Sequence, residues 1–119
     1  VIVLANHLWS TNLTQDDVEC EGISGLTETM VKEAVDEGQH WKLIGKATKQ
    51  DDGSIIASVT PEKLNLLHPL SAINGVVNAI TFSSDMLGDV TISGPGAGRT
   101  ETAYAILSDI IAMHQRGSI

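Results

Sequence analysis

A turn signal near the middle of the chain constrains its fold most. The dipeptide Asp52-Gly53 separates two β-prone runs, residues 41–48 and 54–60, and Asp-Gly between such runs is a strong signal for an antiparallel hairpin. Apolar and polar residues alternate along the first run. The positions expected to face the core are Trp41, Leu43, Gly45 and Ala47, and those expected to face water are Lys42, Lys46 and Thr48.

Further strands and three helices are predicted around this hairpin. The expected strands are residues 18–21 and an antiparallel pair, 75–83 with 89–93. The expected helices cover residues 1–9, a segment from the N-cap Thr27 through Glu37 with Gly38 as its stop, and residues 101–115. Thr14 to Asp17 has the form of a short capped turn, and Thr60-Pro61 is predicted to begin another helical turn. The fold class is therefore α+β, an antiparallel-rich sheet with helices packed on one face.

Composition narrows the class of protein. The 119 residues are enough for one domain, and the single cysteine, Cys20, is expected to be a small buried residue. The net charge of −8 disfavours nucleic acid, which needs a basic surface. Every apolar run is far shorter than the roughly 20 residues of a membrane span. We therefore expect a soluble, cytoplasmic protein with neither nucleic acid nor a membrane as partner.

Both terminal helices indicate that the chain is part of something longer. The first helical pattern begins at Val1 with no N-cap or methionine before it, as if cut in mid-helix. One stripe of the last helix is formed by Ala103, Ile106, Leu107, Ile110, Ile111 and His114. The side chains on its opposite face are small and almost uncharged. We therefore expect this helix to pack on two sides, with a missing part of the protein or a partner covering the second side.

A glycine-rich loop, Gly94-Pro95-Gly96-Ala97-Gly98, runs directly into that last helix. Its glycines allow the backbone to come close to another group, and Pro95 stiffens it. The loop lacks the Gly-Lys-Ser/Thr ending of a P-loop and the third glycine of a dinucleotide fingerprint. On residues alone it is either a tight strand-to-helix turn or a surface that faces a ligand.

Metal and nucleophile chemistry have little support. Four acidic residues cluster in sequence: Asp16, Asp17, Glu19 and Glu21. They lack the calcium-loop pattern and are more typical of a solvated turn followed by the exposed face of a strand. The four histidines have no zinc-site spacing, and His114 is expected to be structural. No serine stands in a recognisable nucleophile context. We predict no metal site.

Three stretches in order resemble the C-terminal part of homoserine dehydrogenase and cover nearly the whole chain. They are Val3-Leu4-Ala5-Asn6 with Asp17 to Ile23; Lys42-Leu43-Ile44 leading to Val59-x-Pro61 and Pro69-Leu70-x-x-Ile73-x-Gly75-x-x-Asn78-Ala79; and Gly94-Pro95-Gly96-Ala97-Gly98-x-x-x-Thr102-Ala103 with Asp109 beyond.

The resemblance implies an NAD- or NADP-dependent oxidoreductase, a cytoplasmic homodimer that interconverts homoserine and aspartate 4-semialdehyde on the route to threonine and methionine. It places a Rossmann domain and an Asp-x-x-x-Lys motif with the catalytic lysine upstream of Val1. Residues 1–119 would then be a partial catalytic and dimerisation domain, inactive alone, whose last helix docks on the missing Rossmann domain. Gly98, Gly96 and Ala97 would abut the cofactor, with short side chains and free backbone N–H groups.

Two other functions remain open from the sequence. The order strand, helix, strand, strand over residues 18–60 is how small amino-acid-binding regulatory modules begin. Cleanly alternating strands also suit a dimerisation domain that extends a sheet across a two-fold axis.

Overall fold

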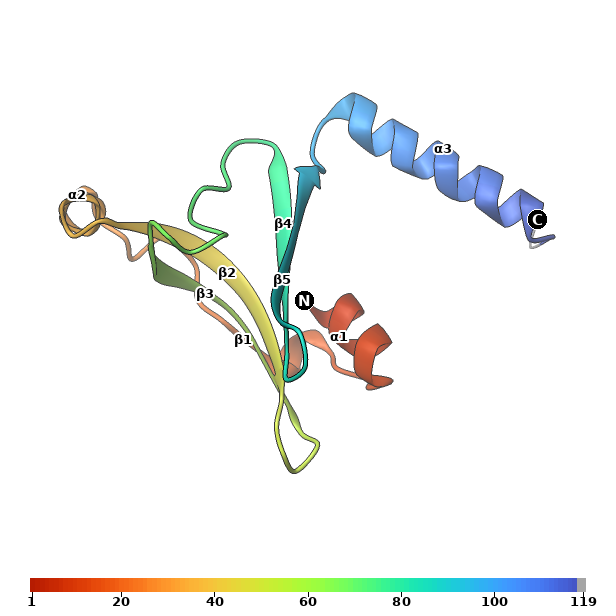
Figure 1. The fold of residues 1–119 in the computed structure, drawn as a ribbon, viewed down its shortest axis with the longest axis horizontal. Coiled ribbons are helices and arrows are strands. Elements are labelled where there is room, and N and C mark those ends of the chain that lie inside the picture. Colours follow the sequence, from red (N-terminus) through yellow and green to blue (C-terminus); the bar gives the residue numbers. More distant parts are fainter. Residues whose placement is uncertain (118–119) are drawn as a thin grey trace. The chain divides into compact units, whose positions relative to one another are not determined.

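A computed structural model describes residues 1–117 of the chain, which fall into two compact units, Val1–Ser71 and a second that begins at Ala72. In order, the elements are α1 (Ile2–Trp9), a 3₁₀ turn (Gln15–Asp17), β1 (Val18–Cys20), α2 (Glu28–Asp36), β2 (Gln39–Lys49), β3 (Ile55–Asn65), β4 (Val77–Ser84), β5 (Gly88–Pro95) and α3 (Arg99–Gln115) (Figure 1). The predicted α+β class is confirmed, with the strands distributed over two small sheets.

The predicted central hairpin is confirmed and is longer than expected. Strands β2 and β3 pair antiparallel from Gln39↔Asn65 to Lys49↔Ile55. Their turn is closed by hydrogen bonds from the Gln50 N–H to the Ser54 carbonyl, 2.8 Å, and from the Gly53 N–H to the Gln50 carbonyl, 2.9 Å. The hairpin is the longest paired element of the first unit, and β1, α1 and α2 all contact it.

The predicted helical turn at Thr60-Pro61 is wrong, because both residues lie inside β3. The Glu21 N–H donates to the Val59 carbonyl, 2.9 Å, so the backbone groups of Val59 face β1. Backbone groups alternate along a strand, so the nitrogen of Pro61 faces the same side. The pairing of β1 ends at Cys20↔Val59, and the missing N–H of Pro61 therefore removes no sheet hydrogen bond.

Strand β1 gives the first sheet a parallel edge. It pairs with β3 from Val18↔Ala57 to Cys20↔Val59, so the sheet order is β1-β3-β2. The expectation that Cys20 is buried is wrong, because the structure leaves it exposed. A three-residue edge strand has little of the unit packed over it, and the sequence alternation of β1 could not reveal that lack of cover.

Two helices contact the hairpin in the first unit. A Cβ atom placed on Gly45 would overlap the Val1 side chain, so the start of α1 lies directly on β2. At the other helix, the Trp41 indole N–H donates to the Met30 carbonyl of α2, 3.3 Å, and the Lys63 ammonium lies 5.8 Å from the Trp41 ring centre. Helix α2 thus lies at the end of the hairpin away from its turn (Figure 1).

The core of the first unit is small. The buried apolar residues among those described are Ala5, Ala34, Ala57 and Leu64. The predicted division of β2 into a dry and a wet face is wrong at three positions. Leu43 is 51% exposed, Gly45 is exposed and Lys42 is half-buried, because the cover over β2 comes locally from α1 and α2 instead of from a layer along its whole length.

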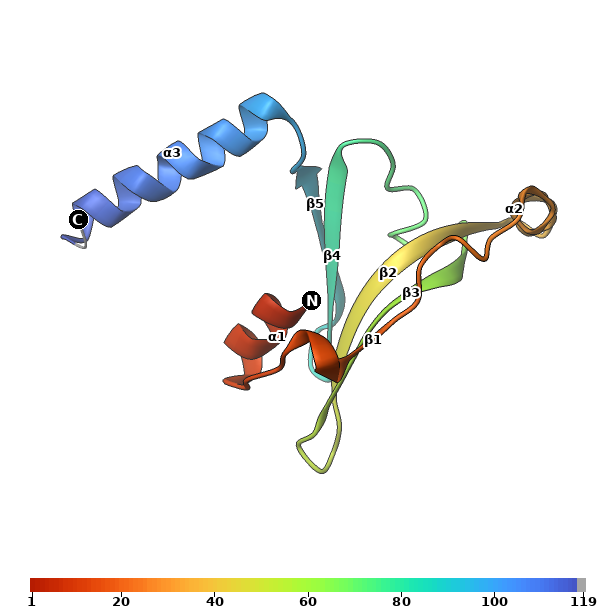
Figure 2. The same cartoon turned by 180° about the vertical axis from the view of Figure 1, so that it is seen from behind.

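The second unit consists of a hairpin and a helix. Strands β4 and β5 pair from Val77↔Pro95 to Ser84↔Gly88, and the hydroxyls of Thr81 and Thr91 lie 2.8 Å apart across the pair. Helix α3 follows within four residues of the end of β5, and both predicted elements are confirmed. Figure 2 shows the hairpin and the helix from behind.

The apolar side chains of α3 are exposed. They include Ile106, Leu107, Ile110 and Ile111, which belong to the predicted stripe, together with Tyr104 and Met113. Neither side of α3 therefore carries a buried residue within residues 1–117. In that described part of the chain, no helix combines the length and apolar character needed to cross a membrane.

Removal of the α2 cap provides a test of this local structure. The Thr27 hydroxyl accepts a hydrogen bond from the Met30 N–H, 3.2 Å, as the sequence predicts. In the full-length protein we expect Thr27→Ala to destabilise α2 by about 1 kcal/mol and to speed hydrogen exchange of its amides about fivefold. Thr48→Ala, at an exposed strand threonine, is the control. Equal exchange in α2 for both variants would contradict the assigned cap.

Candidate functional site

The glycine-rich loop is anchored to the first residue before β4. Strand β5 ends at Pro95, and the next two backbone N–H groups, of Gly96 and Ala97, both donate to the Val76 carbonyl, each at 3.3 Å. A single carbonyl oxygen thus accepts hydrogen bonds from two successive backbone N–H groups. The expectation that the loop's N–H groups are free is wrong for these two residues.

The loop ends at Gly98, which is the N-cap of α3. Its φ of 132° and ψ of 156° lie in a region that only glycine adopts without strain. The Gly98 carbonyl accepts the first helical hydrogen bond, from the Thr102 N–H, 3.0 Å. Within the described residues no side chain caps this helix, and the N–H groups of a first helical turn have no partners inside the helix.

The Glu101 carboxylate lies against the α-carbon of Gly98. A Cβ atom built at Gly98 would overlap this carboxylate. A negative charge in the first turn is favourable for the helix, but it repels a phosphate at the same place. The beginning of α3 is therefore better suited to an uncharged group than to the pyrophosphate of a dinucleotide.

Asn78 also contacts the loop, although the sequence motifs did not assign it to the site. Asn78 lies in β4 opposite Gly94, and its side chain fills the space where Gly96 would carry a Cβ atom. Motif spacing could not identify this contact, because it depends on the register of β4 and β5. The three predicted residues Gly96, Ala97 and Gly98 are thus joined by Asn78 and Glu101.

The acidic residues near β1 form a turn and do not converge on a site. The Asp17 carboxylate accepts hydrogen bonds from the N–H and the hydroxyl of Thr14, at 2.7 and 2.8 Å, which confirms the predicted capped turn. Asp16, Glu19 and Glu21 are exposed. Across residues 1–117, no three His, Cys, Asp or Glu side chains come together as metal ligands.

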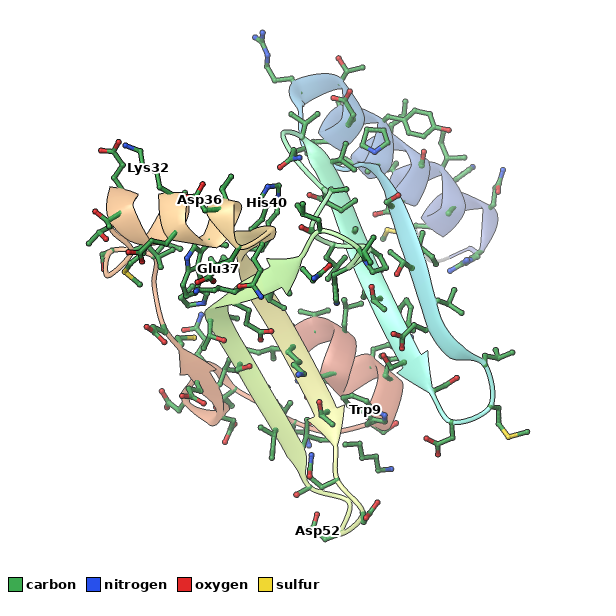
Figure 3. The ribbon with its side chains drawn as sticks, turned by 60° about the vertical axis from the view of Figure 1, so that its left-hand side comes forward. Trp9, Lys32, Asp36, Glu37, His40 and Asp52 are labelled. Atoms are coloured by element: carbon green, nitrogen blue, oxygen red, sulfur yellow. The ribbon has the colours of Figure 1, made fainter. Side chains whose placement is uncertain are left out.

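The histidines are separate, and one has a defined role in a turn. The Nδ1 atom of His68 accepts a hydrogen bond from the Leu70 N–H, 3.1 Å, just after the first hairpin. His114 lies in the last turn of α3. Figure 3 shows His40, Asp36 and Glu37 near the end of α2, where Glu37 pairs with Lys63 at 3.1 Å. The hydrogen bond at His68 and the Glu37–Lys63 ion pair are structural contacts.

The fold and the loop together define an α+β protein in which a glycine-rich turn links a two-stranded sheet to an uncovered helix. A sequence model of the homoserine dehydrogenase family matches residues 1–111. The chain therefore belongs to the homoserine dehydrogenase family, and the family resemblance found in its motifs is confirmed.

Similar proteins agree with this assignment. The chain is 54% identical over 115 residues to an NAD(+)-dependent homoserine dehydrogenase of Pseudomonas canavaninivorans, covering 97% of this chain and 33% of the relative. It is 36% identical over 111 residues to a homoserine dehydrogenase of Bacillus subtilis, covering 93% of this chain and 25% of the relative.

Solved structures share the fold. The S. aureus homoserine dehydrogenase at pH 7.0 superposes with a TM-score of 0.82 at 33% identity, covering 99% of this chain and 30% of that one. The enzyme from Thiobacillus denitrificans gives 0.85 at 26% identity, covering 97% and 27%. This chain thus spans a third or less of the length of its relatives.

The turn at Thr14 to Asp17 should open in acid. The hydrogen bonds from the Thr14 N–H and hydroxyl lower the pKa of Asp17 below its ordinary value. Such a group stabilises the folded state above the ordinary carboxyl pKa, and this contribution is lost as the pH falls through the lowered value. We expect protection of the Thr14 amide from hydrogen exchange, corrected for the intrinsic rate, to fall at acid pH.

The matched variants are Asp17→Asn and Asp16→Asn. The first replaces the titrating acceptor with an uncharged one, so protection at neutral pH should fall and its dependence on acid should vanish. Asp16→Asn should keep the pH dependence of the parent protein. The reverse pattern would show that Asp17 does not hold the turn.

Proposed function

We propose that this chain is part of an NAD(P)-dependent homoserine dehydrogenase, which interconverts L-homoserine and L-aspartate 4-semialdehyde in threonine and methionine biosynthesis. The family match over residues 1–111 carries the proposal. The similarity to the NAD(+)-dependent homoserine dehydrogenase of Pseudomonas supports NAD⁺ as the cofactor. When bound, the cofactor supplies the hydride acceptor, and the protein's task is to position and shield the reacting carbons.

The role proposed for this part of the enzyme is to form one wall of the cofactor site. The loop Gly96-Ala97-Gly98 fits that role because its side chains are absent or a single methyl, and Ala97 is exposed. The N–H groups of the first α3 turn, which no side chain caps within the described residues, offer donors there. The Glu101 carboxylate beside Gly98 disfavours phosphate, so we place the uncharged nicotinamide end of the cofactor at this loop.

The catalytic lysine is proposed to stand immediately before Val1, in the Asp-x-x-x-Lys motif that the resemblance implies. The Val1 side chain lies against Gly45 of β2. A residue that precedes α1 would therefore be held by the same packing of helix on strand. No catalytic residue is assigned within residues 1–119.

The exposed surfaces of the second unit support the proposed partners. Helix α3 exposes Ile106, Leu107, Ile110 and Ile111, and we propose that it docks on the Rossmann domain of the complete enzyme. In the described residues β4 and β5 pair with each other alone, so both outer edges can accept another strand. This supports a homodimer, and we propose a cytoplasmic location for it.

A larger side chain at Ala97 tests the loop as a cofactor wall. In the full-length enzyme we expect Ala97→Leu to raise the KM for NAD(P) about tenfold, a loss of about 1.4 kcal/mol of binding. The midpoint of thermal unfolding should change little, because Ala97 is exposed and its φ is ordinary. Steady-state kinetics with saturating homoserine and varied cofactor measure the effect.

The control is Ala72→Leu, the same change at an exposed alanine outside the loop. Equal KM values for the two variants would mean that the loop is a bare turn. Gly98→Val is a poorer probe, although it too should weaken cofactor use. The φ of 132° at Gly98 makes any side chain there strained, so that variant combines loss of stability with loss of binding.

The segment 1–119 alone should be inactive. It lacks the proposed lysine and the nucleotide-binding domain, so we expect neither tight NAD(P) binding nor reduction of NAD(P) by homoserine. Absorbance at the wavelength of the reduced cofactor checks turnover, and calorimetry checks binding, with the full-length enzyme as the positive control. Homoserine-dependent reduction by the purified segment would overturn this assignment of roles.

A further inference from the structure

We propose that Asn78 is a positioning residue that locks the glycine-rich loop onto β4 through Gly96. Its side chain occupies the space beside the Gly96 α-carbon where any other residue would carry a Cβ atom. The consequence for catalysis rests on the proposed function, since it concerns the loop that we assign to the cofactor. The lock itself is a property of the fold.

The loop is held at two points that lie two residues apart, Val76 just before β4 and Asn78 within it. At the first point, the Val76 carbonyl accepts the N–H groups of Gly96 and Ala97, each at 3.3 Å. At the second, the Asn78 side chain lies over Gly96. Asn78 itself is fixed in the strand pair opposite Gly94, so β4 sets the position of its Cβ atom, which lies 3.2 Å from the Cβ position at Gly96.

The hydrogen bonds alone are a weak anchor. At 3.3 Å, both lie just beyond the usual range of donor–acceptor distances for N–H···O bonds. Packing of a side chain against an α-carbon that has no Cβ atom restricts the loop sterically and needs no hydrogen-bond geometry. We therefore assign to Asn78 the larger part in keeping residues 96–98 in one place.

A fixed loop matters for binding because an ordered site has less conformational freedom to lose. If Asn78 is truncated, the loop samples more conformations and part of the binding free energy of a ligand is used to order it. The KM for the cofactor should therefore rise more than kcat falls. The affected amides of Gly96 and Ala97 should also exchange faster with solvent, because their bonds to Val76 open more often.

The neighbouring glycine provides a matched control. A Cβ atom at Gly94 would meet nothing within 4 Å, and its φ is ordinary for any residue. A Cβ atom at Gly96 would overlap the Asn78 amide, although its φ too is ordinary. Gly96→Ala and Gly94→Ala are therefore the same chemical change in the same loop, and they differ in whether Asn78 is in the way.

The experiment is a double-mutant cycle in the full-length enzyme. The variants are Asn78→Ala, Gly96→Ala, their combination, and Gly94→Ala. The first readout is the KM for NAD(P) and kcat with saturating homoserine. The second is hydrogen exchange of the loop amides without ligand, which needs no activity. Asn78→Ala removes the overlapping amide and leaves a Cβ atom 3.2 Å from the new methyl group at position 96.

If Asn78 holds the loop through Gly96, then Asn78→Ala should rescue the Gly96→Ala variant. Gly96→Ala alone should raise the KM about tenfold, while adding it to Asn78→Ala should change the KM less than about threefold. Asn78→Ala alone should raise the KM about threefold and speed exchange of the Gly96 and Ala97 amides. Gly94→Ala should match the parent enzyme. Additive effects of the two substitutions, or equal effects of Gly94→Ala and Gly96→Ala, would overturn the inference.

The two readouts separate this inference from the proposed function. Suppose that the parent protein does not reduce NAD(P) with homoserine, but that Asn78→Ala restores the hydrogen exchange of the Gly96→Ala variant. This result would support the lock and reject the proposed reaction. An active parent enzyme whose loop exchange is unchanged by Asn78→Ala would reject the lock and keep the reaction. If Gly96→Ala does not fold, its recovery by Asn78→Ala still supports the lock.

Discussion

Buried apolar area is the quantity in shortest supply in this structure. Three of the four buried apolar residues among those described are alanines, Ala5, Ala34 and Ala57. Each side chain is a single methyl, so their burial contributes far less than that of leucine or phenylalanine at about 25 cal/mol per Å². Many larger apolar side chains, with Leu8, Leu43 and Ile110 among them, are exposed instead. Secondary structure here is defined by backbone pairing, while much of the apolar surface remains available for packing.

The features that could be predicted from the sequence are those that do not depend on burial. The hairpin turn, the Thr27 cap and the span of α3 depend on residues close together in the chain, and all three were predicted. The burial of Cys20 and Leu43 was predicted wrongly, because burial depends on what lies over a strand. Pro61 was misplaced for a related reason, since its fit within β3 depends on where β1 stops pairing.

The candidate site shows the same limit. The sequence indicates the loop Gly94 to Gly98 and its helix, because glycine spacing is a local signal. It could not indicate that Val76 accepts two loop amides or that Asn78 fills the space beside Gly96. Both contacts cross the β4–β5 pair and follow from its register. Gly96 therefore has two reasons to be glycine, a packing constraint from Asn78 and the proposed close approach of a cofactor.

The loop is also where strand and helix constraints meet. Its first half is tied to β4, and its second half ends at Gly98, whose φ of 132° sets the direction in which α3 leaves. Movement of residues 96–98 would therefore move the start of α3, and a partner that covers the exposed apolar side of α3 would restrain the same residues. In the proposed enzyme, docking of α3 and placement of the nicotinamide end would thus depend on one short segment. A change on β4 could then affect cofactor binding without touching the cofactor.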